Sequence, residues 1–192
     1  MVDRIPCNDI PDKDLVKKSL LDSFYFSCLY YRYETELQRY IKRISNVSEE
    51  EISDILQESF IKIWKNLNDY NNEITLSSWI YRIVHNQTIS HWRKLQSFGK
   101  ANKVSYEAYF SEATSQETEL TNEPNEKKIQ KIIHQLPINY QSVLVLRYFE
   151  NKNYEEISDI LKIPEGTVAT RLNRAKKFFT KLAKTNNISF FE

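Results

Sequence analysis

Apolar residues recur at spacings of three and four along most of this chain, which is the pattern of amphipathic α-helices. The clearest case runs from Ser48 to Leu67, where Ser48 and Glu51 form the sequence signature of a capping box. Its predicted buried stripe comprises Ile52, Ile55, Leu56, Ser59, Phe60, Ile63, Trp64 and Leu67. No segment shows the alternation of a strand, so we predict an all-α protein.

Three further helical segments are predicted in the N-terminal half. The first is capped by Asp12 or Asp14 and continues to Cys28. Its apolar positions are Leu15, Leu20, Leu21, Phe24 and Cys28. A second helix is predicted over 34–44 and a third over 77–95, separated from the 48–67 helix by the breaking segment NDYNNEIT.

The C-terminal half predicts a helix-turn-helix. Two helices are separated at Pro137, a short helix covers 154–161, and the residues KIP interrupt it. A longer helix then opens at Pro164 and runs to about Lys184, with Val168, Leu172, Ala175, Phe179 and Leu182 on its buried side. A short helix, a turn and a longer basic helix form the layout that places the second helix in the major groove of DNA. The heptapeptide EEISDIL occurs at 50–56 and again at 155–161, and we interpret it as a generic amphipathic helix start.

A segment of different composition separates the two halves. It is rich in Ser, Thr and Glu, and its helical periodicity is weak. We therefore predict a helical domain at 10–100, an acidic linker at 101–126 and a second helical domain at 127–186. The linker is either a solvated tether or a nucleic-acid mimic anchored by Tyr106, Tyr109 and Phe110.

The formal net charge is only +1, but the charges are grouped. Residues 79–103 contain five Lys or Arg and no acid, residues 104–126 contain six Glu and no base, and residues 166–184 contain six Lys or Arg and no acid. Two basic blocks on either side of an acidic segment favour two separate contacts with a polyanion over two ordinary solvated helix faces.

The second helix of the predicted motif has the chemistry of a DNA-reading element. Backbone N–H groups near Gly166 and Thr167 can bind a phosphate at the helix N-terminus. Arg171 and Arg174 lie three positions apart and can share a face that reads guanine or binds the backbone. The polar side of this helix comprises Thr167, Thr170, Arg171, Arg174 and Lys177.

Several function classes are disfavoured. The chain has two glycines, no phosphate-binding loop, no nucleophile motif and no histidine pair at metal-ligand spacing, so we expect neither an enzyme nor a metal or cofactor site. Cys7 and Cys28 are too few for a disulfide framework, and we expect two reduced thiols. No apolar run has the length of a membrane span or a signal peptide, which indicates a cytoplasmic protein without membrane insertion.

The C-terminal segments LP, VLVLRYFE, YEEISDIL and IPEGTVATRLNRAKK resemble, in order and spacing, region 4 of the σ70-type sigma factors of the extracytoplasmic-function (ECF) group. The segments ISDILQESFIKIWKNL and SSWIYRIVHNQTISHWRK resemble region 2 of the same group. The resemblance covers about 24–96 and 129–184. It implies a subunit that binds core RNA polymerase and directs initiation at promoters with −10 and −35 elements.

The resemblance also implies roles for individual residues. Asp54, Gln57 and Glu58 would bind the β′ clamp helices of the polymerase, and region 4 would bind the β flap. Asn71 and Asn72 would form a pocket for a flipped base of the −10 element. The melted strand would be bound by Trp79, Arg82, Asn86, Trp92 and Arg93, as aromatic and cationic side chains suit unstacked bases and phosphates. For Trp79 and Trp92, core packing is the alternative role. The residues of the 167–177 helix would read the −35 element, and an anti-sigma factor is an expected further partner.

Some positions depart from the pattern of the family. Ala169 stands where a basic residue is common, Asn139 and Gln141 are neutral at the start of a helix that contacts DNA backbone, and Ser90 replaces a common aspartate. Lys162 stands at the usual glycine of the turn, where a positive φ would cost about 1 kcal/mol. These departures affect promoter preference and affinity.

Two other classes compete with this hypothesis. A stand-alone helix-turn-helix regulator would explain 129–184 but not the aromatic and basic residues at 79–93. A helical protein that only binds other proteins would lack salt-sensitive affinity for DNA.

Overall fold

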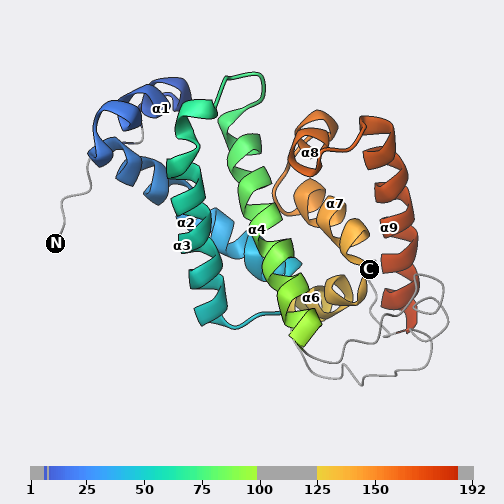
Figure 1. The fold of residues 1–192 in the computed structure, drawn as a ribbon. Helices are drawn as coiled ribbons and strands as arrows, with labels where there is room; N and C mark the ends of the chain where they lie inside the picture. Colours follow the sequence, from blue (N-terminus) through green and yellow to red (C-terminus); the bar gives the residue numbers. More distant parts are fainter. Residues whose placement is uncertain (1–6, 8, 99–124, 186–192) are drawn as a thin grey trace.

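The computed structural model describes Cys7, residues 9–98 and residues 125–185, and these form helices with no strand among them (Figure 1). The predicted all-α class is confirmed. The elements are α1 (Asp12–Leu21), α2 (Ser23–Ile44), α3 (Glu49–Lys65), the short 3-10 helix η1 (Leu67–Asp69), α4 (Leu76–Phe98), α6 (Asn125–Gln135), α7 (Ile138–Tyr148), α8 (Tyr154–Leu161) and α9 (Glu165–Thr185).

Helices α2, α3 and α4 form the core of the N-terminal half, with α1 packed across one end of α2. Helix α3 begins with the predicted capping box: Ser48 N donates to Glu51 at 2.8 Å, and Glu51 N donates to the Ser48 hydroxyl at 3.2 Å. Its predicted stripe is buried except for Trp64, which is 44% exposed and meets the edge of Phe26 at 4.8 Å between ring centroids. The stripe continues through Ile63 to Leu67, and Trp64 lies at its edge.

The first predicted helix is two helices. Asp22 breaks it, because its side chain accepts a hydrogen bond from Phe24 N at 2.9 Å and caps a new helix. That helix, α2, continues to Ile44, so the segment predicted over 34–44 is the C-terminal part of α2 and not a separate helix. Leu21, one of the apolar positions of the predicted helix, is 89% exposed at the break. The prediction that Asp12 or Asp14 caps α1 is also wrong, since Pro11 precedes α1 without a side-chain cap.

Cys7 and Cys28 form a disulfide, so the expectation of two reduced thiols is wrong. The segment before α1 folds back on α2, which brings the two Cα atoms to 5.5 Å. Arg32 on α2 positions that segment, donating to the carbonyl oxygens of Cys7 at 2.6 Å and Ile10 at 2.8 Å. Neither the disulfide nor the hydrogen bonds of Arg32 could be predicted from the spacing of these residues in the sequence.

His85 on α4 lies against the fully buried Tyr40, with 2.8 Å between its Nδ1 atom and the tyrosine hydroxyl. Burial, with a smaller effect of the Arg93 charge, lowers the pKa of His85 to about 4. An unfolded histidine has a pKa of about 6.5, so the unfolded chain binds a proton between pH 6.5 and 4 that the folded chain does not. The stabilisation contributed by the neutral ring is complete above pH 6.5 and is lost as the pH falls towards 4.

We expect this residue to account for roughly 2 kcal/mol of the fall in the free energy of unfolding between pH 7 and pH 4.5. Urea denaturation of the wild type and of His85→Gln at both pH values measures it. The variant should lose less stability on acidification than the wild type, and equal losses would contradict the assignment.

In the C-terminal half, α7 is the central helix and packs against α8 and α9. Pro137 separates α6 from α7 as predicted, and Asn153 with Glu156 forms a capping box at the start of α8. Helix α8 ends at Lys162, which has a φ of 51°. This position therefore does require a positive φ, and the lysine occupies a left-handed conformation that favours glycine.

Lys162→Gly is expected to raise the free energy of unfolding by roughly 0.5–1 kcal/mol, because glycine relieves the steric cost of the left-handed backbone. Lys162→Ala, which keeps a Cβ atom, is the matched control and should give no such gain. Urea denaturation curves compare them. A glycine variant no more stable than the alanine variant would contradict this account.

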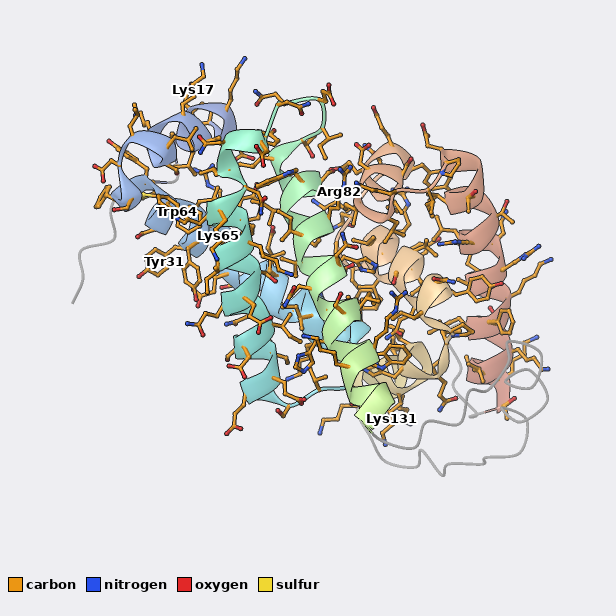
Figure 2. The ribbon with its side chains drawn as sticks, viewed as in Figure 1. Lys17, Tyr31, Trp64, Lys65, Arg82 and Lys131 are labelled. Carbon is orange, nitrogen blue, oxygen red and sulfur yellow. A yellow bond between two sulfur atoms is a disulfide. The ribbon has the colours of Figure 1, made fainter. Side chains whose placement is uncertain are left out.

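The two halves pack against each other, with α8 along α4 and α7 against α2 (Figures 1 and 2). The predicted domain boundaries at 10–100 and 127–186 stay predictions. Most of the predicted linker, including Tyr106, Tyr109 and Phe110, lies outside the described residues. No helix in the described ranges has the length and apolar character needed to cross a membrane.

Candidate nucleic-acid interface

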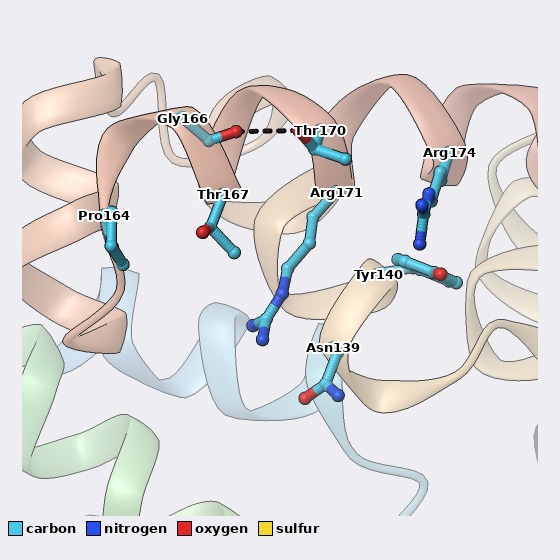
Figure 3. Close-up of a pocket in the computed structure, with 8 residues that line it drawn as sticks. All are labelled: Asn139, Tyr140, Pro164, Gly166, Thr167, Thr170, Arg171 and Arg174. Carbon is cyan, nitrogen blue, oxygen red and sulfur yellow. Dashed lines mark hydrogen bonds between the residues drawn. The ribbon is translucent and has the colours of Figure 1, made fainter.

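The start of α9 and the start of α7 border an open hollow of about 570 Å³ (Figure 3). Its lining comprises Asn139, Tyr140, Pro164, Gly166, Thr167, Thr170, Arg171 and Arg174. Figure 3 shows the side chains of Arg171 and Arg174 extending from α9 towards α7, where Asn139 and Tyr140 lie. The structure thus brings together four of the five residues predicted on α9.

The helix-turn-helix scaffold fixes the direction of these side chains. Val168, Leu172 and Ala175 are buried against the rest of the half, so Thr170 and Arg174 are exposed on the opposite side. The Thr170 hydroxyl donates to the Gly166 carbonyl oxygen at 2.8 Å, within its own helix. Lys177 is exposed one turn further along but does not line the hollow.

Residues of α7 complete this surface; Asn139 was noted in the sequence as a neutral position, whereas Tyr140 was not among the predicted site residues. Tyr140 stacks on Phe178 with 5.3 Å between ring centroids, which holds it beside Arg174. Asn139 is exposed at the rim. Gln141, two residues further along, is buried, and its side chain donates to the Arg43 carbonyl oxygen at 3.1 Å. The neutral residue at 141 therefore serves packing between the halves, whereas Asn139 borders the hollow.

The second group of candidates lies on α4 and the loop before it. Asn71 and Asn72 are exposed in that loop; Asn71 Oδ1 accepts a hydrogen bond from Glu73 N at 3.2 Å, and Asn72 has a φ of 61°. These are features of a loop shaped by asparagine side chains and left-handed backbone. The pair therefore presents an ordered turn at the start of α4.

Along α4, Trp79, Arg82, Asn86 and Arg93 recur at helical spacing on one side. Asn86 and Arg93 are exposed, whereas Trp79 and Trp92 are half-buried. Trp79 contacts Tyr70 with 5.4 Å between ring centroids, so it has both a packing role and an open edge. Arg82 points to the other half of the chain, where its Nε donates to the Asp159 carbonyl oxygen at 2.7 Å (Figure 2).

Helix α3 presents the third group. Asp54, Gln57 and Glu58 are all exposed, on the side opposite the buried Ile52, Ile55 and Phe60. The Glu58 carboxylate accepts a hydrogen bond from the Gln87 side chain, which in turn accepts one from Lys62. This face is acidic and polar, which suits a protein partner with basic residues rather than DNA.

The described residues contain no group of three His, Cys, Asp or Glu side chains that could hold a metal ion. The surfaces above offer hydrogen-bond donors, cations and aromatic edges. Their chemistry is that of binding.

Comparison with known proteins agrees with this geometry. The family model for Sigma-70 region 2 matches residues 29–98, and the model for Sigma-70 region 4 matches residues 126–179. The ECF RNA polymerase sigma factor SigW of Bacillus subtilis is 32% identical over 148 residues, covering 73% of this chain and 78% of that protein. The ECF RNA polymerase sigma-E factor of Haemophilus influenzae is 28% identical over 165 residues, covering 81% and 86%.

Two solved structures share the fold. CnrH in complex with the cytosolic domain of CnrY superimposes with a TM-score of 0.68 at 18% identity, over 91% of this chain and 98% of that one. The sigma factor RpoE of Bartonella quintana, in complex with the anti-sigma factor NepR, gives 0.64 at 17% identity, over 83% and 96%. Both family regions and the curated relatives point to the same group, and the chain belongs to the ECF group of the σ70 family, whose members are sigma factors that direct promoter-specific initiation of transcription.

Proposed function

We propose that α3 docks this sigma factor on core RNA polymerase through Asp54, Gln57 and Glu58, against the β′ clamp helices. The supporting observation is that these polar side chains share the exposed side of a helix whose other side is buried. Substitutions on this exposed side can change its charge without disturbing the buried side. Their effects on polymerase binding and on the stability of the fold can therefore be measured separately.

A second polymerase contact is proposed on the C-terminal half. An apolar hollow of about 220 Å³ lies between α6, α7 and α9, lined by Ile129, Leu144, Tyr148, Phe149, Lys176, Phe179 and Thr180. Apolar side chains line most of it, with Lys176 placed over the Tyr148 ring at 5.4 Å. This concave apolar surface suits a helix of the β flap. It lies apart from the hollow that borders Arg171 and Arg174, so polymerase and DNA can bind region 4 together.

The −35 element is proposed to bind along the start of α9. Thr167, Arg171 and Arg174 border one hollow, where the arginine side chains can reach guanine edges or phosphates. Lys177, one turn further along, would contact the backbone. Asn139 and Tyr140 add donors from α7 on the far side of the hollow.

The −10 element is proposed to bind the loop of Asn71 and Asn72 and the exposed side of α4. A flipped base costs a few kcal/mol of stacking, which pocket hydrogen bonds from the loop offset. Trp79 and Trp92 would stack on bases, with Asn86 and Arg93 on the strand beside them. Arg82 belongs to this group by its position on α4, although in this structure it is hydrogen-bonded to the Asp159 carbonyl oxygen of the other half.

Two further expectations follow from this function. An anti-sigma factor is a proposed partner, since sigma factors with this fold occur in complexes with such proteins. We propose that the chain acts in the cytoplasm, where polymerase and promoters meet, and that it works by binding rather than by catalysis.

Gel filtration of the full chain with core polymerase tests the proposal. We expect a stoichiometric complex, and protection of both promoter elements when that complex binds DNA. A chain that elutes apart from core polymerase would overturn it. A chain that binds promoter DNA tightly without polymerase would instead favour a stand-alone regulator.

A further inference from the structure

The two cysteines of the chain pair with each other but differ in their exposure to water. Cys28, on α2, is only 2% exposed, whereas Cys7 is half-buried, so a dissolved reagent reaches the pair from the side of Cys7. In the cytoplasm, where we propose that the chain acts, thiol pools reduce most disulfides. Those that do form there are usually transient and serve catalysis or the sensing of oxidants.

Hydrogen bonds from Arg32 on α2 hold the segment before α1 in place alongside the disulfide. Its Nη2 atom donates to the carbonyl oxygens of Cys7 at 2.6 Å and Ile10 at 2.8 Å, and its Nη1 atom donates to Asp12 Oδ1 at 2.5 Å. Arg32 and Asp12 are both partly exposed, so water competes for these bonds. After reduction they would keep the two thiols close enough to pair again, but the segment would lose its covalent attachment to Cys28.

Asp12, the first residue of α1, connects this segment to the loop that precedes α4. Its Oδ2 atom accepts a hydrogen bond from the Tyr33 hydroxyl at 2.9 Å. Burial, with a smaller effect of the Asp12 charge, raises the pKa of Tyr70, which follows η1. Helix α1 also packs on η1, at the end of the N-terminal half where this loop lies (Figure 1). The position of α1 therefore bears directly on the start of the loop.

Tyr70 determines how this loop is held. Its hydroxyl donates to the Ile74 carbonyl oxygen at 3.0 Å, which ties one end of the loop to the other. Its ring contacts Trp79 on α4, with 5.4 Å between ring centroids. Asn71 and Asn72 lie between the two tied positions, and both are exposed. A displacement of α1 that moves Tyr70 would consequently move these asparagines.

We propose that Cys7 and Cys28 are a reversible oxidation site for hydrogen peroxide. Their disulfide orders α1 and, through Tyr70, the loop of Asn71 and Asn72. The consequence for the −10 element, a better ordered pocket in the oxidised protein, rests on the proposed function. Oxidation and ordering of the loop are properties of the free chain, so their test needs neither polymerase nor DNA.

The oxidation proceeds in two balanced steps. Peroxide transfers one oxygen atom to the Cys7 sulfur, which gives a sulfenic acid and one molecule of water. The Cys28 thiol then attacks that sulfur, and the disulfide forms as a second molecule of water leaves. The two sulfur atoms together lose two electrons, which the peroxide gains. A dithiol reductant reverses the change by exchange and becomes a disulfide itself.

Thiol titration combined with hydrogen-exchange mass spectrometry of the full chain tests this proposal. Peroxide should remove both titratable thiols of the reduced chain, and a dithiol should restore both while the chain stays folded. Exchange in the first turn of α1 should be about 30-fold faster in the reduced chain, the factor typical of one disulfide. Exchange should also be faster at 67–75, whereas α9 serves as an internal control and should not change.

Two variants separate the effect of the disulfide from other effects of the reagents. Cys7→Ser should exchange at α1 and at 67–75 like the reduced wild type, both before and after peroxide. Cys28→Ala should behave in the same way, which keeps the test decisive if one of the two variants fails to fold.

Three results would overturn the proposal. The first is a disulfide that the dithiol does not reduce in the folded chain. The second is equal exchange at 67–75 in the oxidised and reduced wild type, and the third is redox-dependent exchange that persists in Cys7→Ser. None of them would affect the polymerase-binding experiment, so failure of this proposal and failure of the proposed function are distinguishable.

Discussion

Asp54→Lys is expected to weaken binding to core RNA polymerase by about 10- to 100-fold, because it reverses a charge on the proposed docking face. Each 1.4 kcal/mol is tenfold in affinity, so this loss corresponds to about 1.4–2.8 kcal/mol, the lower part of the range for removing one partner of a charge pair at a protein interface. Asp54 is exposed on α3, with the buried stripe on the opposite side, so the fold should tolerate lysine there. A fluorescence titration of labelled protein with core polymerase measures the effect.

Asp14→Lys is the matched control, since Asp14 is an exposed acid on α1 and the substitution changes the net charge equally. It should bind polymerase like the wild type. The intrinsic affinity of region 4 for DNA should be unchanged in both variants. Equal loss of polymerase binding by the two variants would show a general charge effect and would contradict a specific docking face on α3.

Arg174→Ala and Arg171→Ala are each expected to weaken promoter binding by the holoenzyme by 1–3 kcal/mol, or about 5- to 150-fold, where the arginine reads a base. Both side chains extend into the hollow between α7 and α9, and Arg174 is exposed, so neither is part of the core. Filter binding or anisotropy with promoters that carry single −35 substitutions locates the base each arginine reads. At that position the variant should lose its discrimination.

Lys177→Ala provides the comparison for this experiment. If Lys177 contacts a phosphate, the loss of that contact should weaken binding to all promoter sequences alike. It should also reduce the salt dependence of affinity by about one unit of slope. If all three variants instead lost affinity evenly on every −35 sequence, the reading of bases by α9 would be wrong. If Asp54→Lys and Arg174→Ala produced the same defect, the assignment of polymerase binding to α3 and −35 recognition to α9 would be wrong.

Local features of the fold could be predicted from the sequence because their causes are local. Ser48 and Glu51 cap α3 from three residues apart, and the positive φ of Lys162 follows from the geometry of the turn it ends. Four of the five buried positions predicted on α9 follow from its periodicity alone, whereas Phe179, also predicted there, is only half-buried and lines the apolar hollow. The predicted residues Thr167, Arg171 and Arg174 are brought together for the same reason, since one helix positions all of them.

Contacts between distant residues could not be predicted in this way. Glu150 and Arg43 form an ion pair at 2.8 Å although most of the chain separates them, and each alone reads as an ordinary charged residue. The disulfide between Cys7 and Cys28 depends on a backbone turn before α1 that Arg32 stabilises. The helix break at Asp22 could not be predicted, because the apolar positions on either side of it remain roughly in register.

The repeated heptapeptide EEISDIL shows how tertiary context assigns different roles to one sequence. In α3 the helix continues beyond it, and Asp54 is exposed on the proposed polymerase face. In α8 the left-handed Lys162 ends the helix, the Ser158 hydroxyl donates to the Ile163 carbonyl oxygen at 2.6 Å, and the Asp159 carbonyl oxygen accepts from Arg82. Both copies bury two isoleucines, and the residues that follow determine the rest.

Transcription in vitro from genomic DNA fragments, with core polymerase and the purified chain, tests the central claim most directly. Mapping of the 5′ ends should reveal start sites that require the chain and share two sequence elements at fixed spacing upstream. Arg174→Ala should weaken transcription from those sites by an amount that depends on the sequence of the −35 element. Asp54→Lys should abolish transcription when the concentration of the sigma factor is limiting. Start sites identical to those of core polymerase alone would contradict the assignment of this chain as a promoter-reading sigma factor.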